Sequence, residues 1–312
     1  MKYCFGVDIG GTTVKLGLFS EAGAIVEKWE IVTRTEDEGS AILPDIAEAI
    51  NGKLEQHGIE KEQVLGIGVG VPAPVTVDGI VNGSANLGWK YKNAKKELEE
   101  LTGLTAEFGN DANVAALGEM WKGGGVGYRN MIMVTLGTGV GGGVIIGGKI
   151  LTGINGAAGE IGHIPMKDDE EFACGCGNKG CLEQYASANG IVMITKRYLD
   201  THPEEETTLR DVEKITSKEI FDEAKKGDKV SILMVDEVGR MLGKDLAAVA
   251  CVVNPEAFVI GGGMSKAGDI LIDAIKKYYT KYAFHASRET VFKMAELSNS
   301  AGIYGAVRLV LE

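Results

Sequence analysis

The chain has 312 residues and 45 glycines, so glycine occurs at about twice its usual share of roughly 7%. Its 6 prolines and 45% hydrophobic residues exclude a collagen-like or low-complexity chain, so the glycines must occupy special backbone positions in a globular fold. The net charge of −12, without any block of lysines and arginines, argues against a nucleic-acid partner.

The N-terminus and the apolar stretches predict a cytoplasmic protein without a membrane anchor. Residues 1–10 lack the charged and long apolar regions of a signal peptide, and the longest apolar runs are far too short to cross a bilayer. Five cysteines, an odd number, argue against a disulfide framework. Cys4 and Cys251 lie in apolar segments, where we expect them to be buried.

Strands and helices alternate along the chain, which predicts an α/β fold with mixed sheets. The predicted strands are 3–8, 14–19, 64–71, 105–108, 131–135, 144–146 and 257–260. The predicted helices are 40–57, 93–101, 110–121, 182–198, 217–226, 229–253, 267–281 and 301–311. A strand–glycine turn–strand pattern occurs twice, and aligning Gly10 with Gly137 superimposes the two copies. This favours two related lobes, with two unrelated hairpins as the alternative.

The first glycine turn is Gly10-Gly11-Thr12-Thr13, directly after a strand that carries Asp8. Glycines let backbone N–H groups approach phosphate oxygens, and threonine hydroxyls add donors. Asp8 could hold a hydrated Mg²⁺. The turn matches neither the P-loop nor the dinucleotide-binding fingerprint, and an ordinary hairpin turn is the alternative.

Two further glycine turns point to the same ligand. Gly137, Thr138 and Gly139 could bind the other end of a nucleotide's phosphates. Gly262 and Gly263 follow a buried strand and suit the close approach of a flat group such as adenosine. Each could be only a tight turn, but the three together favour a nucleotide-binding protein. A fourth run, Gly123-Gly124-Gly125, fits none of these sites, and we interpret it as a flexible connection between lobes.

A metal site is indicated by His163, Cys174, Cys176 and Cys181, which lie close together in a glycine-rich segment. Three cysteines and one histidine form a closed tetrahedral Zn²⁺ site, so the zinc would be structural. Three free thiols are the alternative.

Three carboxylates and one amide are candidates for chemistry. Asn110 and Asp111 lie between a strand and a helix, where they could cap the helix or, for Asp111, act as a general base. Glu160 and Glu183 flank the proposed zinc segment, and solvated surface carboxylates are the alternative for both.

These motifs together resemble the ROK family of repressors, open reading frames and sugar kinases over the whole chain. Cys174-Gly-Cys176-Gly-Asn-Lys-Gly-Cys181-Leu-Glu183 is similar to the family's zinc motif, and it is the most specific match. Residues 136–143, followed by Gly153, Gly156, Gly159 and Gly162-His163, resemble its signature.

The resemblance implies an actin-like ATPase (ribonuclease H-like) fold with two lobes and a sugar in the cleft. The implied lobes are 1–117, joined by a returning helix at 300–312, and 118–299 with the zinc loop. It also implies an ATP-dependent hexose kinase in which Asp111 takes the proton from the 6-hydroxyl of the sugar. Substrate contacts are implied for Asn86, Asn110, Asp111, Glu160, His163 and Glu183. ATP contacts are implied for Asp8, Gly10, Gly11, Thr12, Thr13, Gly137, Thr138, Gly139, Gly262 and Gly263, with Mg²⁺ bridging the phosphates.

Within the family, the intact Asp111 and the absence of room for a DNA-binding helix-turn-helix before residue 3 favour a kinase over a repressor. The full zinc motif favours glucose as the substrate, with N-acetylglucosamine or N-acetylmannosamine as alternatives. Ala73 stands where many relatives carry glycine in a loop that borders the sugar, so the choice of hexose stays open. A sugar-sensing protein without catalysis is a further alternative. A homodimer or homotetramer is expected from the family alone.

Overall fold

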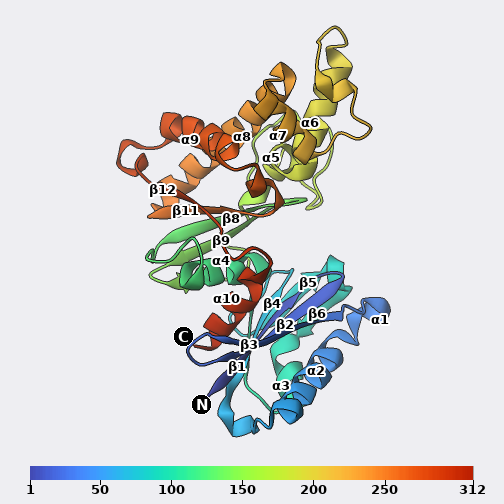
Figure 1. The fold of residues 1–312 in the computed structure, drawn as a ribbon, viewed down its shortest axis with the longest axis vertical. Coiled ribbons are helices and arrows are strands. Elements are labelled where there is room, and N and C mark those ends of the chain that lie inside the picture. Colours follow the sequence, from blue (N-terminus) through green and yellow to red (C-terminus); the bar gives the residue numbers. More distant parts are fainter. Residues whose placement is uncertain (312) are drawn as a thin grey trace. The chain divides into compact units, whose positions relative to one another are not determined.

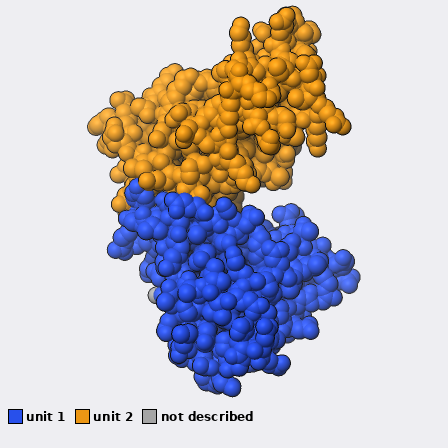
Figure 2. Space-filling view, viewed as in Figure 1, with its two compact units in different colours: residues 1–129, 143–159, 296–312 blue, residues 130–142, 160–295 orange. Residues whose placement is uncertain are grey.

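A computed structural model of the chain describes residues 1–311 (Figure 1). The chain forms two compact units, coloured separately in Figure 2. Unit 1 contains residues 1–129, 143–159 and 296–312, and unit 2 contains residues 130–142 and 160–295. The chain therefore passes from one unit to the other at four points, after residues 129, 142, 159 and 295.

This division differs from the lobes expected from the sequence. A boundary after residue 117 would fall inside helix α4 (Asp111–Lys122), whose buried residues continue to Glu119. Residues 143–159 also belong to unit 1. Helix α4 lies wholly within unit 1, whose first segment extends to residue 129.

Unit 1 contains a five-stranded mixed sheet in the order β3-β2-β1-β4-β7. Its strands are β1 (Tyr3–Ile9), β2 (Thr13–Ser20), β3 (Ile25–Val32), β4 (Val64–Val71) and β7 (Ala106–Asn110). Pairs β1–β2 and β2–β3 are antiparallel, whereas β1–β4 and β4–β7 are parallel. The carboxyl ends of β1, β4 and β7 therefore lie at one edge of the sheet.

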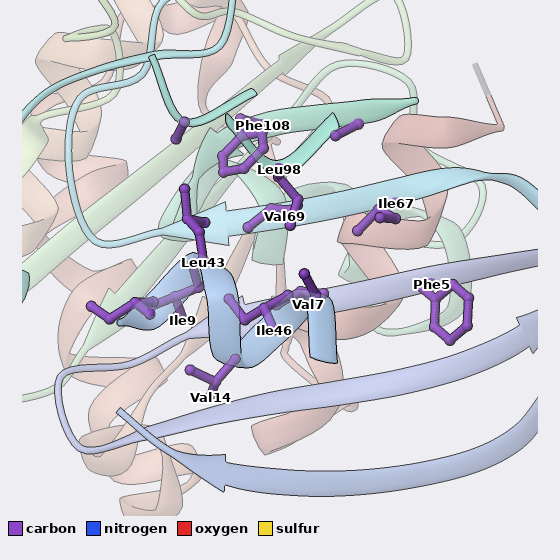
Figure 3. Packing of buried hydrophobic residues seen from close by; sticks show 14 of the residues in the cluster. Phe5, Val7, Ile9, Val14, Leu43, Ile46, Ile67, Val69, Leu98 and Phe108 are labelled. Atoms are coloured by element: carbon purple, nitrogen blue, oxygen red, sulfur yellow. The ribbon is translucent and has the colours of Figure 1, made fainter. Parts of the chain in front are cut away.

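The alternation of side chains along β1 gives this sheet two buried faces. Phe5, Val7 and Ile9 belong to a core cluster that includes Ile46 and other residues of helix α2 (Ile42–His57). Figure 3 shows Val7, Leu43 and Ile46 gathered at this core. Cys4 belongs to a second cluster with Ile303 of helix α10 (Ala301–Val310). Helix α3 (Ala94–Thr102) completes the first cluster through Ala94 and Leu98.

Glycines let helix α10 lie unusually close to the sheet and to α4. A Cβ on Gly68 of β4 would lie 1.7 Å from the carbonyl oxygen of Ala306. A Cβ on Gly305 would lie 1.7 Å from the carbonyl oxygen of Val114 in α4. Both distances are far below van der Waals contact, so larger side chains are excluded here. Part of the glycine excess therefore serves helix packing and no ligand.

A small subsidiary region of unit 1 follows β4. It contains β5 (Ile80–Ser84), the turn η2 (Ala85–Leu87) and β6 (Trp89–Asn93), with β5 and β6 antiparallel. The buried indole of Trp89 donates a hydrogen bond of 3.0 Å to the carbonyl oxygen of Gly39 at the end of α1 (Glu36–Gly39). This bond fixes the segment that carries Asn86 to the rest of the unit.

A second mixed sheet has the order β10-β9-β8-β11-β12. Its strands are β8 (Met131–Leu136), β9 (Val140–Ile146), β10 (Lys149–Ile150), β11 (Ala257–Gly261) and β12 (Val291–Met294). The helices of unit 2 are α5 (Glu183–Ala186), α6 (Ala188–Thr201), α7 (Ser217–Lys226), α8 (Lys229–Val253) and α9 (Asp269–Tyr282). The short helical turns are η1 (Lys61–Gln63), η3 (Ile161–His163), η4 (Thr208–Arg210), η5 (Gly263–Ala267), η6 (His285–Ser287) and η7 (Ser298–Ser300). The α/β class with mixed sheets is confirmed.

Three local expectations were wrong. The single helix expected at 182–198 is two helices, because Ser187 adopts an extended conformation and its hydroxyl caps α6 by accepting from Gly190 N–H. The second glycine turn is shorter than the gap expected between strands 131–135 and 144–146, since β8 extends to Leu136 and β9 already begins at Val140. Cys4 is buried as expected, but Cys251 near the end of α8 is exposed.

Among the described residues, no helix combines the length and apolarity needed to span a membrane.

Candidate functional site

Asp111 is the first residue of helix α4, directly after strand β7. Asn110 caps this helix, because its Oδ1 accepts hydrogen bonds from Ala112 N–H (3.0 Å) and Asn113 N–H (3.1 Å). The Oδ1 of Asp111 also accepts from Ala112 N–H, at 2.8 Å. The capping alternative drawn from the sequence applies to Asn110, and Asp111 lies at the positive end of the helix, where its role as a general base stays a prediction.

The loop after β4 connects Asn110 to Asn86. The side-chain amide of Asn110 donates to the carbonyl oxygen of Ala73 (3.2 Å), and the Ser84 hydroxyl donates to that of Pro72 (3.0 Å). Asn86 lies two residues after Ser84, in η2. Unit 1 thus places Asn86, Asn110 and Asp111 around one short loop.

The first glycine turn lies beside Asn86. A Cβ on Gly11 would be 3.8 Å from the Cβ of Asn86. The turn is closed by a bond from Gly10 N–H to the Thr13 carbonyl (3.0 Å), while Gly11 and Thr12 are exposed. Thr33, which the sequence did not single out, donates its hydroxyl to the carbonyl oxygen of Gly10 at 2.7 Å. A tight turn with exposed N–H and hydroxyl groups is suited to contact an anion.

Asp8 lies on β1, next to this turn. Burial raises the pKa of its carboxyl group, and the nearby Lys15 partly opposes this effect. A Cβ on Gly302 would be 2.5 Å from the Cγ of Asp8, so the start of α10 packs directly on this side chain. A half-buried carboxylate beside a phosphate-sized turn fits a water-mediated Mg²⁺ contact.

The second and third glycine turns meet in unit 2. Gly262 has a positive φ of 84°, and a Cβ there would be 2.5 Å from the carbonyl oxygen of Leu136. The next residue of the second turn, Gly137, accepts a hydrogen bond from Ala188 N–H at the start of α6 (2.8 Å). The two turns predicted to bind ATP, at 137–139 and 262–263, are therefore neighbours.

A pocket of about 210 Å³ lies beside the third turn. Gly263 and Met264 line it together with Phe221 and two lysines of α7, Lys218 and Lys225. Apolar walls with nearby cations suit a nucleoside and its phosphates.

The metal ligand atoms of His163, Cys174, Cys176 and Cys181 all lie within 4.8 Å of one another. The Sγ atoms of Cys176 and Cys181 are 3.7 Å apart, and Cys174 Sγ is 3.7 Å from His163 Nδ1. A tetrahedral zinc with bonds of about 2.3 Å to sulfur and 2.0–2.1 Å to nitrogen requires edges of about 3.8 and 3.6 Å. The four residues fit zinc in chemistry, and these two distances match the edges of a zinc tetrahedron.

The protonation of the three cysteines also favours a bound cation at this cluster. The pKa values of the Cys174 and Cys181 thiols are raised, mainly by burial. The pKa of Cys176 is lowered, mainly by a hydrogen bond from the Asn178 N–H. Two buried thiols become thiolates only if a positive charge compensates them. A bound zinc ion supplies that charge.

Glu183 lies between the metal cluster and the second glycine turn. Its Oε1 accepts from Cys174 Sγ at 2.9 Å and is 3.8 Å from His163 Nδ1. A Cβ on Gly139 would be 2.5 Å from its Oε2. Glu160 lies on the other side of the imidazole, with its Oε2 3.9 Å from His163 Nε2. Zinc bound at the cluster would hold His163, whose imidazole lies between the two carboxylates.

A wide hollow of about 730 Å³ lies on unit 2 beside these groups. Thr138, Gly139 and Glu183 line one part of it, and Phe172, Met193 and Arg197 line another. The predicted site residues therefore form two groups, each brought together within its own unit. Unit 1 holds Asp8, Gly10, Gly11, Thr12, Thr13, Asn86, Asn110 and Asp111, and unit 2 holds the others.

These groups can be compared with known proteins. The model of the ROK family matches residues 4–312. The chain belongs to the ROK family. Its fold is accordingly the actin-like ATPase fold expected above.

Individual members of the ROK family are similar to this chain over its full length. A glucokinase from Halalkalibacterium halodurans is 44% identical, with 99% of this chain and 95% of that protein covered. A ROK glucokinase from Streptomyces griseus, solved with glucose and AMPPNP, is 35% identical with a TM-score of 0.77, covering 98% of each chain. A ROK family transcriptional regulator described as a homologue of an E. coli protein is 25% identical with a TM-score of 0.87, and this chain covers 77% of it.

Proposed function

We propose that this protein transfers the γ-phosphoryl group of ATP to the 6-hydroxyl of glucose. The observation that carries the proposal is the 44% identity with a glucokinase across 99% of the chain. The structure of a relative with glucose and AMPPNP supports the same pair of substrates. The transcriptional regulator shares the fold, but its identity to this chain is only 25%.

In this proposal Asp111 is the general base. Its carboxylate accepts the proton of the sugar hydroxyl as that oxygen attacks the γ-phosphorus. Ala112 N–H fixes one carboxylate oxygen at 2.8 Å, so the base is oriented before substrate arrives. Asn110, tied to the loop at Ala73, and Asn86 hold neighbouring hydroxyls of the sugar.

Glu160, His163 and Glu183 of unit 2 bind the remaining sugar hydroxyls. His163 can serve both as a zinc ligand and as a sugar contact, because its two nitrogens face different groups. Nδ1 faces Cys174 of the zinc cluster, and Nε2 faces Glu160. Zinc at the four ligands is structural because no open coordination position remains for a substrate. It holds the loop that carries the two glutamates.

The glycine turns bind ATP. Backbone N–H groups of Gly11, Thr12, Thr138 and Gly139 contact the phosphates, while Gly262, Gly263, Phe221 and Met264 receive the adenosine. Asp8 would hold Mg²⁺ through water, and the bound ion would supply positive charge that neutralises the phosphates. The protein's own residues position the two substrates, donate hydrogen bonds to the phosphates and provide Asp111 as the base.

Sugar phosphorylation should be measured with a coupled ADP-release assay on glucose, mannose, fructose, N-acetylglucosamine and N-acetylmannosamine. We expect glucose to have the highest kcat/KM. A preference for an N-acetyl sugar would change the substrate, and tight glucose binding without ADP release would indicate a sugar sensor.

Asp111→Asn is the matched test of the base. Asparagine keeps an acceptor for Ala112 N–H but cannot take a proton, so kcat should fall by about 10²-fold or more while glucose still binds. Asp45→Asn, which removes a surface ion pair with Arg34, should leave kcat unchanged. Turnover above a tenth of the wild-type rate in Asp111→Asn would exclude this role.

A further inference from the structure

The glycine run after helix α4 is an ordered turn, contrary to the flexible connection expected from the sequence. Gly123 N–H and Gly125 N–H both donate to the carbonyl oxygen of Glu119, each at 3.0 Å. Gly124 N–H donates to the side-chain Oε2 of Glu119 at 2.9 Å. Each of the three N–H groups is thus bonded to one residue of α4.

The carboxylate of Glu119 also binds a second segment, far away in sequence. Its Oε2 accepts from Glu296 N–H at 3.0 Å, and its Oε1 accepts from Leu297 N–H at 2.8 Å. The side chain is completely buried. A buried carboxylate that accepts three backbone N–H groups makes charge-assisted bonds, which are stronger than bonds between neutral groups.

The two segments held by Glu119 adjoin two of the four points where the chain passes between the units. Residues 123–125 precede the passage after residue 129, and residues 296–297 directly follow the passage after residue 295. Gly123 is required at this junction, because a Cβ there would lie 2.0 Å from Glu119 Oε2. Its φ of −123° is accessible to any residue, so the close approach alone excludes a side chain.

We propose that Glu119 is a positioning residue that fastens both segments to helix α4, and so transmits movements of unit 2 to the helix that begins with Asp111. This inference rests on the proposed kinase function for its catalytic consequence. Hinges are formed by a few residues at the ends of elements, and their arrangement decides whether a closing unit completes the site. From one position, eight residues after the base, Glu119 holds the segments next to two of the four passages.

Two variants disturb this anchor in different ways. Glu119→Gln keeps the size of the side chain but places an amide N–H₂ against backbone donors. Gly123→Ala inserts a methyl group at the carboxylate. Each has a matched control in unit 1: Glu99→Gln makes the same change where the carboxylate accepts a bond from Ala106 N–H (3.0 Å) that the glutamine Oε1 can keep, and Gly52→Ala adds a Cβ with no atom within 4 Å.

Two readouts should be combined on the full chain, well below the melting temperature of each variant. Hydrogen–deuterium exchange in segments 123–126 and 295–298 should rise roughly tenfold in both test variants. For glucose, kcat per folded protein should fall about tenfold, with the KM for ATP changed less than threefold, because Glu119 and Gly123 neither line the adenosine pocket nor bond to the glycine turn at 10–13. Both controls should keep wild-type kcat and wild-type exchange in these segments.

The outcomes are separable. Faster exchange with kcat within twofold of wild type would mean that Glu119 only stabilises unit 1, and unchanged exchange would overturn the anchor itself. If the wild-type protein forms no glucose 6-phosphate, the proposed function fails, and exchange alone then decides whether Glu119 fastens the two segments.

Discussion

Asp245 on helix α8 is a buried carboxyl group that should make the stability of unit 2 depend on pH. The residue is 1% exposed, and neither carboxyl oxygen has a hydrogen-bond partner among the described residues. Burial raises its pKa from 3.8 to about 7, because the charged form is poorly solvated there. The neutral form is therefore the one that the fold favours.

The sign and size of the effect follow from this pKa. Between pH 4 and pH 7 the folded protein holds a proton that the unfolded chain has lost, so stability falls as pH rises. The difference between 3.8 and about 7, at about 1.4 kcal/mol for each pH unit, corresponds to about 4 kcal/mol. For a unit of this size, that energy corresponds to a melting-temperature change on the order of 10 °C.

Asp245→Asn tests this reasoning, because asparagine stays neutral at every pH. We expect the variant to melt only a few degrees above wild type at pH 5, measured by circular dichroism, because most of the interval between pKa 3.8 and about 7 lies above that pH. At pH 8 the variant should melt higher, by up to about 10 °C. Other carboxylates titrate in both proteins, so they cancel in the difference.

Asp236→Asn is the control on the same helix. Burial acts to raise the pKa of Asp236, but hydrogen bonds from Lys277 and Tyr278 outweigh it and lower the pKa. This variant should therefore melt lower than wild type at both pH values. A difference between Asp245→Asn and wild type that stays constant from pH 5 to pH 8 would refute the argument.

Two further predictions concern the candidate site. Cys176→Ser should reduce bound zinc, measured by elemental analysis, from about one ion per chain to well below one and raise the KM for glucose, whereas the exposed Cys251→Ser should change neither. Gly139→Ala should raise the KM for glucose about tenfold or more, because its Cβ would lie 2.5 Å from Glu183 Oε2 and displace that carboxylate. A Gly139→Ala enzyme with wild-type KM would show that Glu183 does not hold the sugar in its present position.

Elements with strong local signals were predicted accurately from the sequence. Helix α7 agrees at both ends, because Thr216 caps its start and Gly227 ends it in a left-handed conformation. Strand β4 agrees as well, since Val64–Val71 is a continuous run of small and apolar residues. Strand β3 was missed because Ile25–Val32 (IVEKWEIV) places charged residues at its centre without a strict alternation of polar and apolar positions, and none of its residues is fully buried.

The candidate site could be predicted where neighbouring residues act together. The zinc cluster is recognisable because three cysteines fall within eight residues. Thr33 could not be found in this way, since a single threonine that bonds to Gly10 has no local pattern. The boundaries of the two units could not be predicted from the sequence either, because residues 143–159 belong to unit 1 only through tertiary contacts. One such contact is the approach of Gly156 to the backbone of Val75.

Glu119 and Asp245 show what the sequence could have revealed and what only the structure explains. Both are acidic residues on the buried face of a helix, where a carboxylate is costly unless it finds partners. Their positions among buried neighbours are readable from helical periodicity, so both could have been marked as exceptions. Their consequences differ because of their partners. Glu119 has backbone donors from two segments and can act as an anchor, whereas Asp245 has none described and should be a pH-dependent weakness. The same residue class on the same kind of surface therefore predicts opposite results: removing the charge should loosen unit 1 at Glu119 and stabilise unit 2 at Asp245 above pH 7.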